Sequence, residues 1–119
     1  MITIEKVKAE MADLVEDDRK VDLTFGANKY GAHRRHLVNI RKYEFLNKIA
    51  LLLEHKPTEG FLQAQRTVVL ENIATIEARY KPFVKDNPIN SSCTLAEYRK
   101  LMGVPDLKAQ LKNIDYILN

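Results

Sequence analysis

The sequence has few of the residues that would point to a disulfide-stabilised, secreted or membrane protein. Cys93 is the only cysteine among 119 residues, and a lone thiol fits a reducing compartment better than a secreted scaffold. The longest uninterrupted apolar run, Ile49 to Leu53, is far shorter than the ~20 residues of a membrane-spanning helix. Met1 to Lys6 run directly into charged positions, without the apolar core of a signal peptide. We therefore expect a cytoplasmic protein with no membrane partner.

Motifs with a known chemistry are equally scarce. Gly26 and Gly31 have the spacing of a phosphate-binding loop, but Ala32 and His33 stand where that loop requires Lys and Ser or Thr. His33 and His36 are spaced like two metal ligands on one helix, yet no cysteine or carboxylate cluster completes the set. No serine elbow, paired-carboxylate site or Cys–His pair stands out. We expect no catalytic residue, no metal and no cofactor, and hence a protein that is not an enzyme.

The composition is that of an ordinary globular protein, with 45% hydrophobic and 29% charged residues. A chain of this length is of single-domain size and should bury roughly two thirds of its unfolded surface. We find no internal repeat and no low-complexity segment. The sequence therefore predicts one α-helical domain over residues 1–119.

The charge is segregated along the chain, although the formal net charge is only +3. Residues 1–18 hold two lysines against six acids, a net charge of −4. Residues 19–56 hold nine Lys and Arg against three acids, a net charge of +6, together with all three histidines. Either the acidic first helix pairs with the basic second one, or the basic part binds an acidic partner.

The N-terminal part predicts one helix followed by an irregular segment. Thr3 is a good N-cap, and apolar residues at helical spacing follow until Asp17 and Asp18, where negative charge opposes the helix dipole. Residues 19–32 are ambiguous, because three apolar side chains alternate with polar ones as in a half-buried strand. We expect an extended segment near residues 20–31 with a loop at Gly26 to Gly31, and a short β-hairpin is the alternative.

The stretch from Leu37 to Tyr80 predicts a long antiparallel helix hairpin. One helical pattern runs from about Ala32 to His55, and its apolar residues face several directions in the first half. Pro57 breaks the pattern, Thr58 is an N-cap, and a second helix follows with a near-heptad seam. A connection this short makes the two helices antiparallel neighbours, and Pro82 is expected to end the second.

The C-terminal part predicts a surface connection and then two short helices. Residues 81–93 read as the connection. Thr94 to Glu97 form a capping box and Gly103 a stop, and the last apolar face runs from Leu107 to Leu118. The pair resembles a helix-turn-helix only weakly, because Arg99 occupies the place of the usual small residue. The predicted fold is all-α, a small bundle built on the long hairpin.

The basic start of the long central helix is the best candidate site that the sequence offers. Two arginines in a first helical turn are unfavourable by themselves, and a bound anion would reverse that sign. We expect an anion- or partner-binding patch made of Lys29, His33, Arg34, Arg35, Arg41 and Lys42. The leading hypothesis is a non-enzymatic interaction or assembly protein that binds a protein partner or itself, for example a small phage-encoded accessory or virion protein. The alternative is nucleic-acid binding through the same patch, or through the C-terminal helices.

Overall fold

The computed structural model describes the backbone of residues 1–25 and 29–119 and the side chains of residues 1–21 and 31–119. All secondary structure in these described parts is helical, which confirms the predicted all-α class. The chain divides into two compact units, Met1–Pro57 and Thr58–Asn119, and each is described by itself. Whether residues 1–119 act as one domain stays a prediction.

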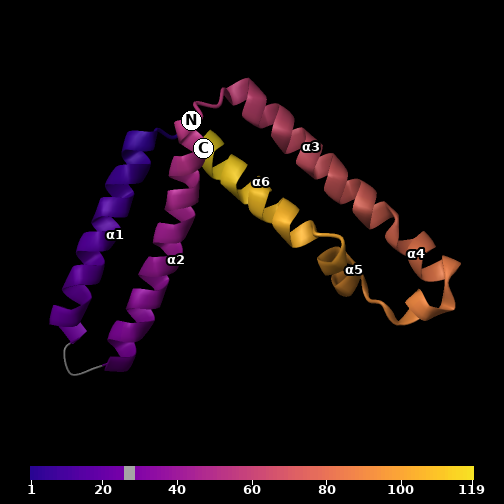
Figure 1. The fold of residues 1–119 in the computed structure, drawn as a ribbon, viewed down its shortest axis with the longest axis horizontal. Coiled ribbons are helices and arrows are strands. Elements are labelled where there is room, and N and C mark those ends of the chain that lie inside the picture. Colours follow the sequence, from indigo (N-terminus) through magenta and orange to yellow (C-terminus); the bar gives the residue numbers. More distant parts are fainter. Residues whose placement is uncertain (26–28) are drawn as a thin grey trace. The chain divides into compact units, whose positions relative to one another are not determined.

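The first unit is an antiparallel pair of long helices, α1 (Ile4–Phe25) and α2 (Lys29–Glu54), that lie side by side (Figure 1). The predicted N-cap is confirmed, because the Thr3 hydroxyl oxygen accepts from the backbone N–H of Lys6 at 3.3 Å. Buried apolar side chains come from both helices: Val7 and Val21 from α1, and Leu46, Ile49, Ala50 and Leu53 from α2. The burial of apolar side chains stabilises such a helix pair.

The predicted end of the first helix was wrong. Residues 19–25, expected to be extended, continue α1 to Phe25, and residues 29–31 already belong to α2, so no described part of the predicted β segment is a strand. Val21 follows Val7 and Leu14 at seven-residue spacing, so it lies on the same side of α1, where it is buried. Its alternation with polar neighbours therefore did not indicate a strand. The remainder of the predicted loop, residues 26–28, lies outside the described residues.

The second unit contains the remaining helices, and its two longest pack against each other. The helices are α3 (Glu59–Ala78), α4 (Tyr80–Asp86), the 3₁₀ helix η1 (Pro88–Ser92), α5 (Leu95–Leu101) and α6 (Val104–Leu118). Leu62 and Val69 of α3 and Ile114 of α6 are buried. Arg66 of α3 forms an ion pair with Asp115 of α6 at 2.7 Å, and Arg99 of α5 forms one with Glu77 of α3 at 2.9 Å.

The described packing thus pairs α2 with α1 and α3 with α6. The antiparallel α2–α3 hairpin that the sequence predicts spans the boundary between the two units, and it stays a prediction. The local signals that separate these helices are confirmed. The Thr58 hydroxyl oxygen caps α3 by accepting from the backbone N–H of Phe61 at 3.1 Å.

Proline and glycine set the helix boundaries in the second unit. Helix α3 ends at Ala78, four residues before Pro82, where the proline ring would clash with the helical carbonyl. Pro82 itself lies in the first turn of α4, so it ends one helix while being part of the next. Gly103 adopts a left-handed conformation, with φ of 78°, and separates α5 from α6 as predicted.

Residues 81–93 are more regular than the predicted surface connection. They contain most of α4 and all of η1, and aromatic contacts hold them to α5. The ring of Tyr98 is buried and lies 5.4 Å from that of Tyr80 and 4.9 Å from that of Phe83. The Tyr80 hydroxyl donates to the Cys93 carbonyl at 2.6 Å, so this side chain combines apolar packing with a satisfied polar end.

Within the described residues, no helix has the combination of length and apolar character needed to span a bilayer.

Candidate functional site

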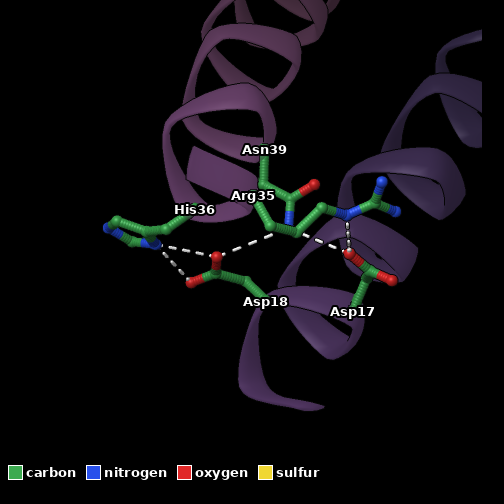
Figure 2. Close-up of polar contacts among 5 residues, drawn as sticks. All are labelled: Asp17, Asp18, Arg35, His36 and Asn39. Atoms are coloured by element: carbon green, nitrogen blue, oxygen red, sulfur yellow. Dashed lines mark hydrogen bonds and ion pairs between the residues drawn. The ribbon is translucent and has the colours of Figure 1, made fainter. Parts of the chain in front are cut away.

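A cluster of five polar side chains joins the C-terminal half of α1 to the N-terminal half of α2 (Figure 2). Asp17 and Asp18 come from α1, and Arg35, His36 and Asn39 come from α2. We call these five residues the acid–base cluster. Arg35 Nε donates to Asp17 Oδ2 at 3.1 Å, and His36 Nδ1 lies 2.7 Å from Asp18 Oδ1. Each aspartate therefore has its own basic partner across the helix pair.

Asn39 lies between these two pairs and links them. Its side-chain amide donates to Asp17 Oδ2 at 2.9 Å and has a longer contact of 3.4 Å with Asp18 Oδ1 (Figure 2). The residue is only 4% exposed, and it is the one buried polar residue in the described part of the chain. A buried amide needs hydrogen-bond partners, and the carboxylate of Asp17 supplies the stronger of the two.

The cluster stabilises the charged form of Asp17. Hydrogen bonds from Arg35 and then from Asn39 hold the pKa of the Asp17 carboxyl below its usual value, and the positive charges of Arg35 and Lys42 act in the same direction. Negative charge in the later turns of α1 is thus compensated from α2. This compensation explains why the helix continues beyond two adjacent aspartates.

The structure separates the residues of the predicted basic patch. Arg35 of the patch, and His36 beside it, pair with the acids of α1, as the self-pairing explanation predicts. His33, Arg34, Arg41 and Lys42 are exposed, and Lys42 is close enough to Asp17 to lower its pKa. The side chain of Lys29 lies outside the described residues. The prediction that Arg34 and Arg35 lie in a first helical turn was wrong. Helix α2 begins at Lys29, and both arginines follow in its second turn.

A hollow of about 320 Å³ lies beside the cluster, on one face of the α1–α2 pair. We call it the α1–α2 hollow. It is lined by Leu14, Val15, Asp18, Asn39, Ile40, Tyr43 and Glu44. Three apolar side chains at its rim are well exposed: Val15 at 57%, Ile40 at 37% and Tyr43 at 39%. The hollow therefore offers an apolar surface with a polar edge provided by the acid–base cluster.

The sequence interpretation did not identify this hollow, although part of the signal was present. Leu37, Val38, Ile40 and Tyr43 are spread around α2 rather than gathered in one stripe, which indicates that more than one side of this helix is suited to packing. Helix α1 covers only one of those sides. The partner residues of α1, above all Val15, could be placed on the same face only once the pairing of the two helices was known.

The acid–base cluster also has one arrangement that is found in catalytic sites. Asp18 binds His36 at Nδ1, which leaves Nε2 on the outer side of the ring, as in a carboxylate-oriented general base. However, the described residues that line the α1–α2 hollow include no serine, threonine or cysteine to serve as a nucleophile. Nor do the described residues include a group of three or more His, Cys, Asp or Glu side chains that is placed to hold a metal ion.

Neither a scan against protein-family models nor searches of curated proteins and of solved structures found a match to this chain.

Proposed function

We propose that this protein is a non-enzymatic helical interaction protein that binds a protein partner, or a second copy of itself, through the α1–α2 hollow and its rim. The observation that supports the proposal is the exposure of Val15, Ile40 and Tyr43 around one concave surface. Exposed apolar residues that gather around a hollow are typical of docking surfaces, whereas isolated ones need no explanation.

The architecture of the first unit supports the same proposal. A helix pair is a single layer, and a layer with apolar residues on a face requires a second layer to cover that face. Val15 is contributed by α1 and Ile40 by α2, so the uncovered surface extends across both helices. The lone thiol of Cys93 supports action in the cytoplasm.

A binding experiment with matched baits tests the proposal. Wild-type protein and the variants Val15→Glu and Val68→Glu are immobilised and exposed to native lysate, while self-association is followed separately by sedimentation. Val68 lies on α3 and is 53% exposed, so its substitution is a control of the same chemistry in the other unit. We expect V15E to lose a protein, or self-association, that wild type and V68E both retain. If all three behave alike in both assays, the proposal is wrong.

Nucleic-acid binding is the second candidate, and the arrangement of basic residues on α2 favours it. Arg34, Arg41 and Lys48 recur every seven residues, so they lie along one side of the helix, and all three are exposed. None of their side chains has a hydrogen bond or ion pair with a described residue. Such a row can contact a phosphate backbone.

The test of this second candidate is the electrophoretic mobility of DNA and RNA at low and moderate salt. Binding should weaken steeply as salt rises, and the double variant R34A/R41A should bind less tightly to every sequence tried. An unaltered mobility at low salt would rule this candidate out.

A further inference from the structure

We propose that the occupant of the α1–α2 hollow is the same face of a second copy of this chain, related by a two-fold axis that runs parallel to α1 and α2. This inference rests on the proposed function and deepens it by naming the partner. It follows from three features of the first unit: a protruding side chain, a recess at the same level, and opposite charge on the two helices.

The protrusion and the recess lie on one face. Val15 is the most exposed apolar residue at the rim, whereas Leu14 and Asn39, further inside the hollow, are half-buried and buried. Val15 of α1 is level with Ile40 of α2, because the Asp18–His36 contact sets the register of the antiparallel pair and both residues line the same hollow. A face that has both a protrusion and a recess at one level can be complementary to itself.

The direction of the axis determines which helices meet. With an axis parallel to the helices, α1 of one copy lies over α2 of the other at unchanged level, so each Val15 is placed against Ile40 and Tyr43 of the opposite copy. All neighbouring helices are then antiparallel, as in the common four-helix bundle. With an axis across the helices, α1 would lie over α1 and α2 over α2.

Charge favours the parallel axis. Helix α1 carries seven acids against four bases, a net charge of −3, whereas α2 carries six bases against two acids, a net charge of +4. The parallel axis places the acidic helix of each copy over the basic helix of the other, and like-charged helices become diagonal neighbours. The crossed axis would bring like-charged helices into direct contact, which disfavours that arrangement.

Sedimentation equilibrium tests self-association. Wild type should approach twice the 13.7 kDa mass of one chain as its concentration rises. V15E places a carboxylate at the centre of the proposed interface, so the dissociation constant should rise more than about tenfold, whereas V68E should behave as wild type. A wild type that stays monomeric, or a V15E that dimerises like wild type, would overturn the inference. In the monomeric case the proposed function would survive if V15E still lost a protein captured from lysate.

Disulfide cross-linking tests the axis and does not depend on whether V15E folds. In a Cys93→Ser background, chains carrying Val15→Cys are mixed with chains carrying Ile40→Cys and oxidised. The parallel axis predicts that the mixture forms a mixed disulfide dimer efficiently, whereas Val15→Cys chains alone cross-link poorly. Efficient cross-linking of Val15→Cys chains alone, without the mixed product, would overturn the proposed axis.

Discussion

Asn39 provides the sharpest test of how the first unit is held together. It is a buried amide that joins two carboxylates of the opposite helix, so Asn39→Ala removes the shared donor and leaves the basic partners Arg35 and His36 in place. A hydrogen bond to a charged group contributes about 1.5–3 kcal/mol to stability. The second contact, at 3.4 Å, is long and adds little.

The loss of stability expected for N39A within that range depends on how far the two accepting carboxylates are exposed to water. The Asp17 and Asp18 side chains are 43% and 33% exposed, so water replaces part of the lost interaction. We therefore expect N39A to lower the free energy of unfolding by about 1.5 kcal/mol. Since small proteins have urea m-values of roughly 1–3 kcal/mol/M, the unfolding midpoint should fall by about 0.5–1.5 M. The assay is urea unfolding followed by far-ultraviolet circular dichroism at one fixed protein concentration, because association also adds stability.

Asn39→Asp is the matched variant of the same shape. It places a third carboxylate within hydrogen-bond distance of Asp17, so at neutral pH it should destabilise more than N39A. The neighbouring acids should raise the pKa of the introduced carboxyl, and its protonated form can donate as the amide did. The penalty should therefore shrink as the pH falls from neutral to about 4.5, which N39A should not show. If N39A equals wild type, or if N39D is as stable as wild type at neutral pH, the reasoning about the cluster is wrong.

Two further predictions concern the same helix pair. Because the pKa of Asp17 is lowered, its charged form stabilises the fold at pH above the usual value of 3.8, and this contribution is lost as the pH falls through the lowered pKa. Asp17→Asn should therefore reduce the melting temperature at neutral pH and match wild type in strong acid. An equal difference in melting temperature at both pH values would contradict this. Leu46 is 6% exposed in the middle of the buried side of α2, so Leu46→Ala should cost about 2–5 kcal/mol in urea unfolding, and a loss below about 1 kcal/mol would show that the two helices do not pack through it.

Features set by neighbouring residues could be predicted from the sequence. The N-caps at Thr3, Thr58 and Thr94 and the stop at Gly103 each depend on one side chain or one glycine within three or four residues of the helix end. The helical class follows from the apolar spacing for the same reason. These elements required no knowledge of how the helices pair.

Features set by contacts distant in the sequence could not be predicted in the same way. Asp17 and Asp18 indicated a helix end, and their partners on α2 are 18 to 22 residues away. The self-pairing explanation of the charge segregation already contained that answer. Without those partners, two adjacent aspartates predict a helix end, and residues 19–25 are then expected to be extended.

The candidate site also has features that neighbouring residues set, which could be predicted, and features that distant contacts set, which could not. The basic residues of α2 were recognised from the sequence, and one of the six predicted patch residues, Arg35, binds an acid of α1, as does the neighbouring His36. The α1–α2 hollow combines Leu14 and Val15 with Ile40 and Tyr43, which are about 25 residues apart in the chain and become neighbours only in the antiparallel pair. A site that is built across two helices has no continuous motif for the sequence to display.

The central claim is that the face around Val15, Ile40 and Tyr43 is the docking surface, and the most direct test is to record amide NMR spectra while the wild-type protein is diluted. Dissociation should shift the signals of residues that line the α1–α2 hollow, and V15E should have the dilute-state positions at every concentration. The signals of Phe61 and Val68 on α3 should not move with dilution. Shifts confined to α3, or to Val38 and Leu52 on other sides of α2, with those of the hollow unchanged, would contradict the claim.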